Sequence, residues 1–584
     1  MFVKITASKG HQYAQLTQSY RNADGQPRQR QIMTLGRVDE DGGPVDRLLQ
    51  SLLKARGLAV GPGSTAVPDV RFESSLALGD VWALDQLWRE IGFDALAGVF
   101  RRARYTNPVE QAIRLMVFNR LCDPDSKLGV LRWAQTVSVP GVDTAKFTHQ
   151  QLLRAMDALM DRQADVDECV AHLLRPLIDE EMSVVFYDLT TIRAEGLSQQ
   201  PDDVRHHGMS KEGVIARQFL LGVVQTADGL PIHHEVFDGN ASEGQTLLPL
   251  LQRLLGRFPH IRRLVLVADR GLLSLDNLEA LAALKLPAGP GGARTLEYIL
   301  AVPGRRYGEF EPVLQAFQQK VAAEAARVQA LRSAGEPATP AETVDEATWL
   351  GRRLVVAHNP ERAAEQAAQR QRRIAELQAR AQALSDKLDA QDGGQRGRGR
   401  ALSDSGAKAR FFHEVAQAHL ASIIKVDLKS DLFTYEIDDQ ALARAELMDG
   451  KLLLVTNVAD LTPAQVVQRY KALADIERGF RVLKSEIEIA PVFHRLPERI
   501  RAHASICFMA LILYRVMRQR LKRAGHQASP ETALAVLRRI QRQTITINDS
   551  APITGVSSIR PEQATVLAAL KLKKPSPDPQ MQLL

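Results

Sequence analysis

Three acidic residues are placed along the chain where they could support metal-assisted phosphoryl chemistry. Asp188 follows the apolar run Val184–Tyr187, and Asp269 follows a second run, Leu264–Ala268. If these runs are neighbouring parallel strands, both carboxylates lie at one edge of the sheet, and a divalent cation would offset their repulsion. Hard oxygen ligands of this kind select Mg²⁺ or Mn²⁺. The runs alone leave open the alternative that each Asp only ends its strand and caps the loop that follows.

The third carboxylate is Glu477, inside a segment with helical periodicity. On one continuous helix, Tyr470, Leu473, Glu477, Arg481 and Lys484 would share a face. A carboxylate among cations suits a site that holds both a metal ion and a phosphate backbone. The alternative is an ordinary solvated helix face with ion pairs, and Glu486 or Glu488 would replace Glu477 if the geometry failed.

Other catalytic chemistries lack their residues. An aspartyl-phosphate enzyme usually carries a second Asp two residues after the first, where this chain has Thr190. No phosphate-binding loop of the Gly-x-x-x-x-Gly-Lys type occurs. The pairs His206-His207 and His233-His234 are adjacent in sequence, so their side chains would point apart in a strand and form a poor metal site.

The elements that must position the acidic residues follow a recognisable order. Short apolar runs and amphipathic stretches between 184 and 302 predict three strands, a helix, a strand, a helix and a strand. This order predicts a mixed sheet, with acidic residues after the first and fourth strands. It is the arrangement of an RNase H-like nucleotidyl-transfer core, whose last helix would carry Glu477 after a long insertion.

The remaining chain predicts a multidomain α/β protein. The expected boundaries are 1–56 for a β-meander plus helix, 57–70 for a linker, 71–180 for an α-helical DNA-binding domain, 181–305 for the first part of the core, 306–452 for an insertion, 453–525 for the second part of the core and 526–584 for a C-terminal region and tail. Within the insertion, the heptad-like spacing at 360–390 fits either a coiled coil or an intramolecular helical hairpin.

Composition and charge narrow the class of protein. The 584 residues are 45% hydrophobic and 24% charged, which is ordinary for a globular protein, and a net charge of +7 favours a polyanionic partner. The three cysteines are far apart, which argues against a cysteine zinc site and fits a reducing cytoplasm. The longest apolar stretch, Ala504–Tyr514, is too short to cross a bilayer and predicts a buried helix.

Several motifs resemble the DDE transposases of bacterial insertion sequences, in the branch with a Tyr-Arg-Glu-Lys signature helix. Tyr470, Glu477 and Lys484 match the signature spacing, whereas Leu473 stands at its Arg position. The other similar segments are FYDLTTI around Asp188, HHGMSK at 206–211, PIHHEVFDGNASEGQT at 231–246, LVADRGLLS around Asp269, DPDSK at 123–127, RIRAHASICFMALIL at 499–513 and the N-terminal YAQLTQSYR and RQRQIMTLGR.

The resemblance implies an RNase H-like core in which Asp188, Asp269 and Glu477 coordinate two Mg²⁺ (or Mn²⁺) ions. It implies DNA contacts from Tyr470, Arg481, Lys484, Lys211 and Arg270. Whether Arg478 replaces the signature Arg stays open.

The implied reaction is hydrolysis at the element ends followed by 3′-OH strand transfer. The implied partners are the terminal inverted repeats and target DNA, bound by a homodimer in a cytoplasmic, nucleoid-associated setting without a membrane. A fragment ending near residue 180 would bind the ends. The alternatives are an inactive DNA-binding remnant and a site-specific nuclease that performs no strand transfer.

Overall fold

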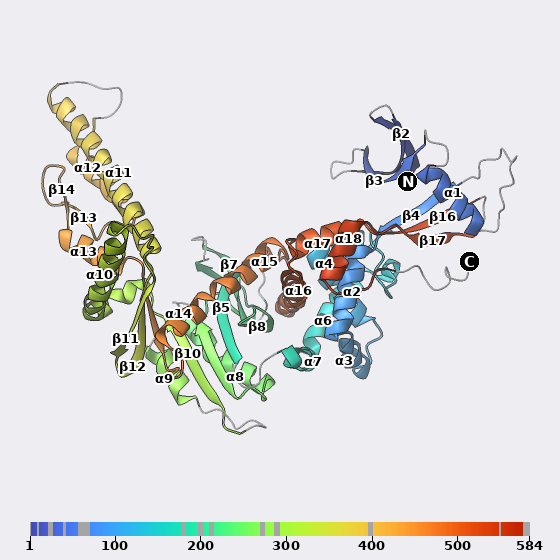
Figure 1. Ribbon diagram of the computed structural model, residues 1–584, viewed down its shortest axis with the longest axis horizontal. Helices are drawn as coiled ribbons and strands as arrows, with labels where there is room; N and C mark the ends of the chain where they lie inside the picture. The colour runs from blue at the N-terminus through green and yellow to red at the C-terminus, as the bar shows by residue number, and fades with distance from the viewer. Residues whose placement is uncertain are drawn as a thin grey trace. The chain divides into compact units, whose positions relative to one another are not determined.

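The computed structural model describes residues 2–8, 11–21, 27–38, 43–55, 70–177, 183–196, 200, 202–209, 215–268, 275–284, 292–394, 401–547 and 551–575. The chain forms two compact units. The first consists of Met1–Ile178, Leu189–Ala241 and Glu477–Leu584, and the second of Asp179–Asp188 and Ser242–Ile476. The boundary falls inside strand β5 (Ser183–Arg193) and inside helix α15 (Ala474–Ser485) (Figure 1).

A mixed sheet forms the centre of the second unit. Its strand order is β11-β12-β15-β10-β9-β5. The strands are β11 (Thr343–Trp349), β12 (Arg352–His358), β15 (Lys451–Thr456), β10 (Thr295–Ala301) and β9 (Arg263–Ala268). β9 runs parallel to both β5 and β10, whereas β15 is antiparallel to β10 and β12. The first and fourth predicted strands correspond to β5 and β9. The prediction that they are neighbours in the sheet is therefore confirmed.

Helices cover both faces of this sheet. On one face, Val184 and Phe186 of β5 pack in one core cluster with Val466 and Val467 of α14 (Pro463–Lys471). Side chains alternate along a strand, so Tyr187 points to the opposite face, where its hydroxyl bonds Thr246 of α8 (Glu243–Arg257) at 2.8 Å. The short helix α9 (Leu275–Ala283) connects β9 toward β10 and contacts α8.

The insertion contributes to the central sheet and also has a core of its own. β11 and β12 belong to the sheet, so the whole of 306–452 does not fold out as a separate lobe. After α10 (Glu311–Ser333), the helices α11 (Pro360–Asp392) and α12 (Asp404–Gln417) pack as a hairpin through Ile374, Leu384 and Phe411. This confirms the intramolecular hairpin. The small strands β13 (Ile424–Val426) and β14 (Tyr435–Ile437) and helix α13 (Asp439–Met448) complete this part.

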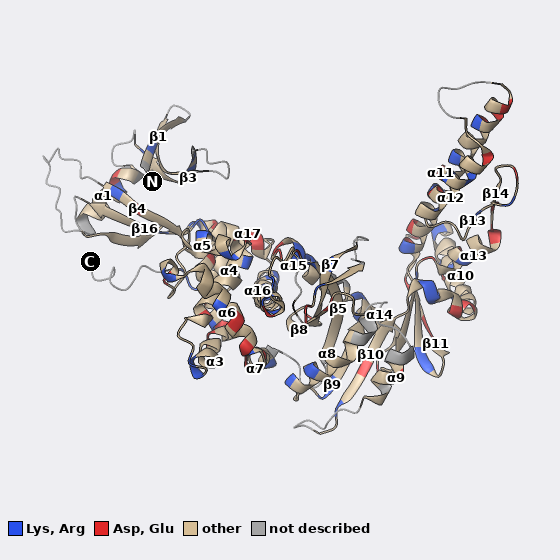
Figure 2. Cartoon of the chain, turned by 180° about the vertical axis from the view of Figure 1, so that it is seen from behind, with Lys and Arg blue, Asp and Glu red and all other residues tan. Residues whose placement is uncertain are grey.

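The charges on the hairpin helix α11 are mixed. Its sequence contains six Lys or Arg and six Asp or Glu residues, and Figure 2 shows both signs interspersed along α11 and α12. The hairpin therefore has no uniformly basic face of the kind that tracks a phosphate backbone.

In the first unit, α-helices surround one long buried helix, α16 (Pro497–Arg523). α16 contacts α4 (Val109–Cys122), α6 (His149–Asp161) and α17 (Pro530–Leu537). Among the described residues, α16 is the one helix long and apolar enough to span a membrane by composition, and 89% of its apolar window is buried inside the protein. The predicted buried helix is confirmed. The remaining helices are α2 (Gly79–Ile91), α3 (Leu96–Arg102), α5 (Lys127–Ala134), α7 (Gln163–Leu174) and α18 (Pro561–Ala569).

Two small sheets contain the N-terminal strands β1 to β4. β1 (Phe2–Ser8), β2 (His11–Arg21) and β3 (Pro27–Arg37) form the predicted antiparallel meander, followed by α1 (Pro44–Ala55). Residues from 70 onward were expected to be helical, but β4 (Val70–Ala77) is a strand. It pairs with β16 (Gln541–Ile547), which in turn pairs with β17 (Ile553–Val556).

This pairing changes the expectation for an N-terminal fragment. A chain ending near residue 180 would lack β16, the partner of β4, and α16, the partner of α4 and α6. Both partners bury apolar surface of the N-terminal part, so we no longer expect that fragment to fold by itself.

The first unit also contains the strands that continue from β5. β7 (Ile215–Thr226) pairs with β6 (His206–Met209) and with β8 (Pro231–Asp238), and β5 lies next to β7 in the sheet. α16 contacts β8, where the ring of His234 stacks on Phe508 with centroids 4.3 Å apart.

The close approach between α2 and the C-terminal segment gives a test of this fold. A Cβ atom at Gly79 would overlap the carbonyl oxygen of Leu537 and lie 2.8 Å from Cβ of Ile540. We therefore expect Gly79→Ala to lower the free energy of unfolding by about 1–3 kcal/mol through overpacking. Gly98→Ala on α3 is the matched control, because nothing lies within 4 Å of its Cβ. It should be neutral or stabilise by up to about 1 kcal/mol. Urea titrations of both variants would check this, and equal effects would contradict the contact.

Candidate active site

Parallel pairing of β5 and β9 sets the position of the first two acidic residues. The register places Val185 opposite Leu266 and Tyr187 opposite Ala268. An Asp follows Tyr187 in the sequence, and another Asp follows Ala268. The side chain of Asp188, and the whole of Asp269, lie outside the described residues, as do Arg270 and Lys211. The register itself is well specified, because β9 is buried on both faces. A slip by one residue would turn every side chain of β9 to the opposite face of the sheet.

The signature segment is not one continuous helix. α14 ends at Lys471 and α15 begins at Ala474, with the N–H of Leu473 donating to the carbonyl of Tyr470 at 2.9 Å. The prediction of a single helix from Pro463 to Lys484 is therefore wrong. The side-chain positions before and after this turn do not follow one helical face.

Leu473 lies in the apolar core rather than on the site. It is 5% exposed and belongs to the same core cluster as Val184, Val265 and Val467. A guanidinium at this position would be buried among the aliphatic side chains of that cluster, where burial of a charge is costly. The departure from the signature therefore has a packing explanation, and Leu473 makes no phosphate contact in this fold.

α15 turns one face inward and leaves basic groups toward solvent. Phe480 and Leu483 are buried. The side chains of Ile476, Glu477 and Arg478 lie outside the described residues. Arg481 is exposed and Lys484 is half-buried.

Gly479 allows α15 to approach α16 and β7 closely. A Cβ at this position would lie 2.8 Å from both Nη2 of Arg515 and Nε2 of Gln225, two side chains that are themselves buried. The sequence analysis missed this contact, although an isolated Gly within a helical pattern is a signal for close packing.

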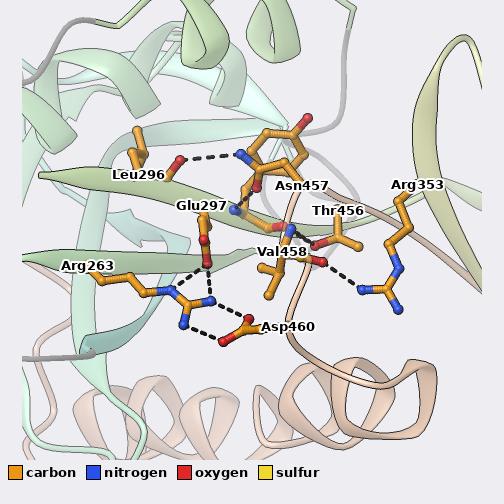
Figure 3. A network of polar contacts seen from close by, with 9 residues as sticks. Arg263, Leu296, Glu297, Arg353, Thr456, Asn457, Val458 and Asp460 are labelled. Carbon is orange, nitrogen blue, oxygen red and sulfur yellow. Dashed lines mark hydrogen bonds and ion pairs between the residues drawn. The ribbon is translucent and has the colours of Figure 1, made fainter.

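A polar network holds the connection that leads from β15 into α14 (Figure 3). The side chain of Asn457 takes the place of a neighbouring strand for the backbone of β10. Its Oδ1 accepts from the N–H of Tyr298 at 2.7 Å, and its Nδ2 donates to the carbonyl of Leu296 at 3.3 Å. Arg353 donates to the carbonyl of Val458 at 2.6 Å. Side chains therefore satisfy backbone groups of β10 and of the connection between β15 and α14.

Arg263 is the charged centre of the same network. Its guanidinium donates to Glu297 and to Asp460, each at 2.6 Å (Figure 3). Hydrogen bonds to Asp460 and Glu297 raise the pKa of Arg263 above its ordinary value. Thr462 then caps α14 in a reciprocal capping box with Gln465, with Pro463 in the first turn. No sequence pattern had indicated the network.

A buried arginine and a buried histidine hold the segment that follows α15. Arg120 of α4 donates to the carbonyls of Ile487 and Glu488 at 3.4 and 3.2 Å. His503 of α16 donates from Nε2 to the carbonyl of Ile489 at 3.0 Å. Burial lowers the pKa of His503 well below its ordinary value, so its imidazole is neutral.

The DPDSK motif contributes a buried lysine to this region. Lys127 is 6% exposed, and burial together with the nearby Arg120 lowers its pKa to about 7. The same groups depress the pKa of His494 to about 3, with burial as the main cause followed by Lys127. Lys127 is therefore the buried residue of this motif, whose Asp123, Asp125 and Ser126 are exposed.

Two family models match the chain. Residues 179–513, more than half of the chain, match the transposase DDE domain, and residues 3–60 match the N-terminal domain of IS1634 family transposases. The first match spans the strand pair β5–β9 and the helices α14 and α15. The chain therefore belongs to the transposase DDE domain family. It is a DNA transposase of an insertion sequence.

Comparison with curated proteins gives no match. Among solved structures, the chain is similar to the piggyBac transposase in a cryo-EM structure of its synaptic complex with hairpin DNA. The identity is 9% and the TM-score 0.34, with 79% of this chain and 78% of that chain covered. The family assignment rests on the two sequence models.

The depressed pKa of Lys127 predicts a pH dependence of stability. The unfolded chain binds this proton up to about pH 10.5, whereas the folded chain releases it near pH 7. Between these values the unfolded state holds more protons, so folding stability gains from this group as pH rises. Lys127→Met should remove that gain, whereas Lys146→Met, at an exposed lysine of the same unit, should not. Urea unfolding of the variants between pH 6.5 and 10 measures the difference, and parallel curves for wild type and Lys127→Met would contradict the prediction.

Proposed function

We propose that this transposase hydrolyses its element ends and then transfers the freed 3′-OH to target DNA, with Asp188, Asp269 and Glu477 as its catalytic carboxylates. The observation that supports this most is the β5–β9 register, in which Tyr187 and Ala268 are paired and each is followed by an Asp. Adjacent strands are about 4.8 Å apart. Asp188 was expected to follow its strand, but it lies within β5, which continues to Arg193, whereas β9 ends directly before Asp269. Two acidic residues at the same level of neighbouring parallel strands are suited to share a cation.

The strand order supports an RNase H-like core. β8, β7, β5, β9 and β10 are successive neighbours, with β7–β8 antiparallel and β5–β9–β10 parallel. Along the chain, β5, β7 and β8 follow one another, with the small strand β6 between β5 and β7. Helix α8 then connects β8 to β9, and helix α9 connects β9 to β10. We propose that α15, which follows the insertion, is the helix that completes this core with Glu477.

The donor chemistry fits two Mg²⁺ or Mn²⁺ ions. Within the described residues, no group of three or more His, Cys, Asp or Glu could hold a metal ion, and the three proposed ligands have side chains beyond that part of the chain. Carboxylate oxygens on adjacent strands are hard ligands, which suits these dications. When bound, such ions stabilise charge on the attacking and leaving oxygens of phosphodiester chemistry.

The chain's own residues would bind and orient the DNA. We assign Arg481 and Lys484, one turn apart near the end of α15, to backbone phosphates, together with Tyr470, Lys211 and Arg270. Glu486 is a weaker candidate for the third carboxylate, because its hydrogen bond with Glu531 raises the pKa of Glu531 and engages both groups with each other.

The N-terminal meander is the proposed reader of the element ends. Its three strands contain Lys4, Arg21, Arg28, Arg30 and Arg37 but no Asp or Glu. Lys4, Arg28 and Arg30 are exposed. A small sheet with this charge suits a phosphate backbone, whose binding weakens steeply with salt.

The catalytic assignment is tested by isosteric loss of charge. Asp188→Asn, Asp269→Asn and Glu477→Gln should each abolish divalent-cation-dependent cleavage of end DNA while leaving binding nearly unchanged, since each removes an anionic ligand without adding bulk. Glu488→Gln is the control, because Glu488 is exposed and its backbone carbonyl makes its contact with Arg120. Cleavage near the wild-type rate in any of the three would refute the assignment. If wild type nicks a plasmid target but never joins DNA to it, the protein is a site-specific nuclease without strand transfer. If wild type binds end DNA but does not cut it, the protein is an inactive DNA-binding remnant of a transposase.

The DNA path along α15 is tested by Lys484→Ala. We expect weaker end complexes and a slope of log affinity against log salt that is shallower by about one, as for the loss of one phosphate contact. Lys522→Ala, at an exposed lysine near the end of α16, should leave both quantities unchanged. Gel retardation over a salt series provides the measurement. An unchanged slope for Lys484→Ala would place the DNA elsewhere.

A further inference from the structure

The small sheet β4-β16-β17 has one covered face and one hollowed face. On the covered face, Ile545 of β16 packs with Leu53 of α1 in a core cluster. Arg542 of β16 pairs with Leu76 of β4 and with Val556 of β17. Side chains alternate along a strand, so these three lie on the face opposite Ile545. There they line a groove of about 730 Å³ together with α2 and the segment 137–144.

The wall 137–144 is attached to β4 by backbone hydrogen bonds. The N–H of Ala77 donates to the carbonyl of Thr136 at 2.9 Å, and the N–H of Ser138 donates to the carbonyl of Ala77 at 2.8 Å. Ala77 and Val137 thereby form a parallel bridge. The groove is therefore bounded by fixed backbone, as is usual for a site that receives a ligand without large rearrangement.

The C-terminal part of the chain reaches this groove after α18. Nε1 of Trp82 and Nε2 of Gln86 both donate to the carbonyl of Lys573 at 2.9 Å, and the N–H of Lys573 donates to Oε1 of Gln86 at 2.9 Å. Pro575, two residues later, is buried. Because Trp82 also lines the groove, the chain is bound at the groove wall where the described residues end.

The sequence that follows Pro575 is suited to an apolar groove. Ser576–Leu584, which lies outside the described residues, reads SPDPQMQLL and contains no Lys or Arg. Its nine residues could span about 30 Å when extended, which is ample for a site bordered by Trp82. Pro577 and Pro579 restrict the residues before them to extended conformations, so less entropy is lost on docking.

We propose that the groove binds the chain's own segment Ser576–Leu584, with its apolar side chains against the apolar lining. That lining includes Leu76, Trp82, Val139, Val142 and Val556. Asp578 of the segment pairs with Arg542, which is exposed and donates to the neutral Oγ of Ser138 at 3.3 Å.

The charge of the groove favours this peptide over a nucleic acid. Among the lining residues that the structure describes, Arg542 is the one cation, and Asp143 is acidic. A phosphate backbone is bound by a stripe of several basic residues. The docked segment would connect the C-terminal part of the chain to α2 and β4, a role that does not depend on the catalytic assignment.

The test is a competition with a synthetic peptide of residues 574–584 that carries a fluorescent label, followed by fluorescence anisotropy. A full-length variant with Met581→Asp, Leu583→Asp and Leu584→Asp should leave the groove open and bind the peptide. Wild type should bind it at least about tenfold more weakly, because an attached segment competes at an effective concentration in the millimolar range. Equal binding to both proteins, or binding to neither, would overturn the proposal.

A charge exchange then tests the place of the peptide in the groove. Added to the tail variant, Arg542→Glu should weaken peptide binding by up to about fivefold, as for an exposed ion pair. A peptide with Asp578→Lys should recover that loss on Arg542→Glu. Arg101→Glu is the matched control, because Arg101 is exposed at the end of α3 and does not line the groove. Equal effects of Arg542→Glu and Arg101→Glu would contradict the pairing.

Sedimentation velocity decides whether the segment binds its own chain or a second copy. Wild type and the tail variant should have the same sedimentation coefficient at each point of a dilution series. An association of wild type that the tail variant lacks would assign the segment to a second copy and overturn the proposal. Neither DNA nor a metal ion enters these measurements, so they are decided separately from the proposed function.

Discussion

The parallel hydrogen bonding between β5 and β9 is the constraint on which the proposed catalytic centre depends. It sets Tyr187 level with Ala268 and therefore the chain positions of Asp188 and Asp269. The pairing is stable because β9 is apolar and buried on both faces, with α14 on one side and α8 on the other. A buried parallel pair tolerates no slip in register, so two residues about eighty positions apart are brought to one level by packing alone.

The signature segment shows how the same core limits the chemistry. Val466, Val467 and Leu473 are all core residues, and α14 ends soon after the last of its inward positions. The chain then restarts as α15, whose inward residues belong to the other unit. Of the residues proposed to contact DNA, Arg481 and Lys484 lie on α15. The position that the signature gives to Arg is part of the hydrophobic interior.

Irregular segments next to the core are held by side chains that donate to backbone carbonyls. Arg353 does this where β15 leads into α14, and Arg120 and His503 do it after α15. Carbonyls buried outside helices and strands need such partners. The connection before α14 and the connection after α15 are therefore both held by hydrogen bonds. Positioned phosphodiester chemistry requires such fixed supports.

Local sequence determined the elements whose pattern is complete within a few residues. The strands before Asp188 and Asp269, their order, the meander, the hairpin at 360–390 and the buried helix around Ala504–Tyr514 all follow from apolar periodicity. The tertiary structure alone decided features that depend on distant partners. The segment of β4 was predicted to be helical, but it forms a strand because β16 provides its hydrogen-bond partners. Ser75 of β4 bonds Gln541 of β16, although the two residues are 466 positions apart. Leu473 was placed on one helical face with Glu477 by its spacing, but it lies in the apolar core next to the sheet. In each case a residue's role is set by what packs against it, and that information is not carried by its neighbours in the sequence.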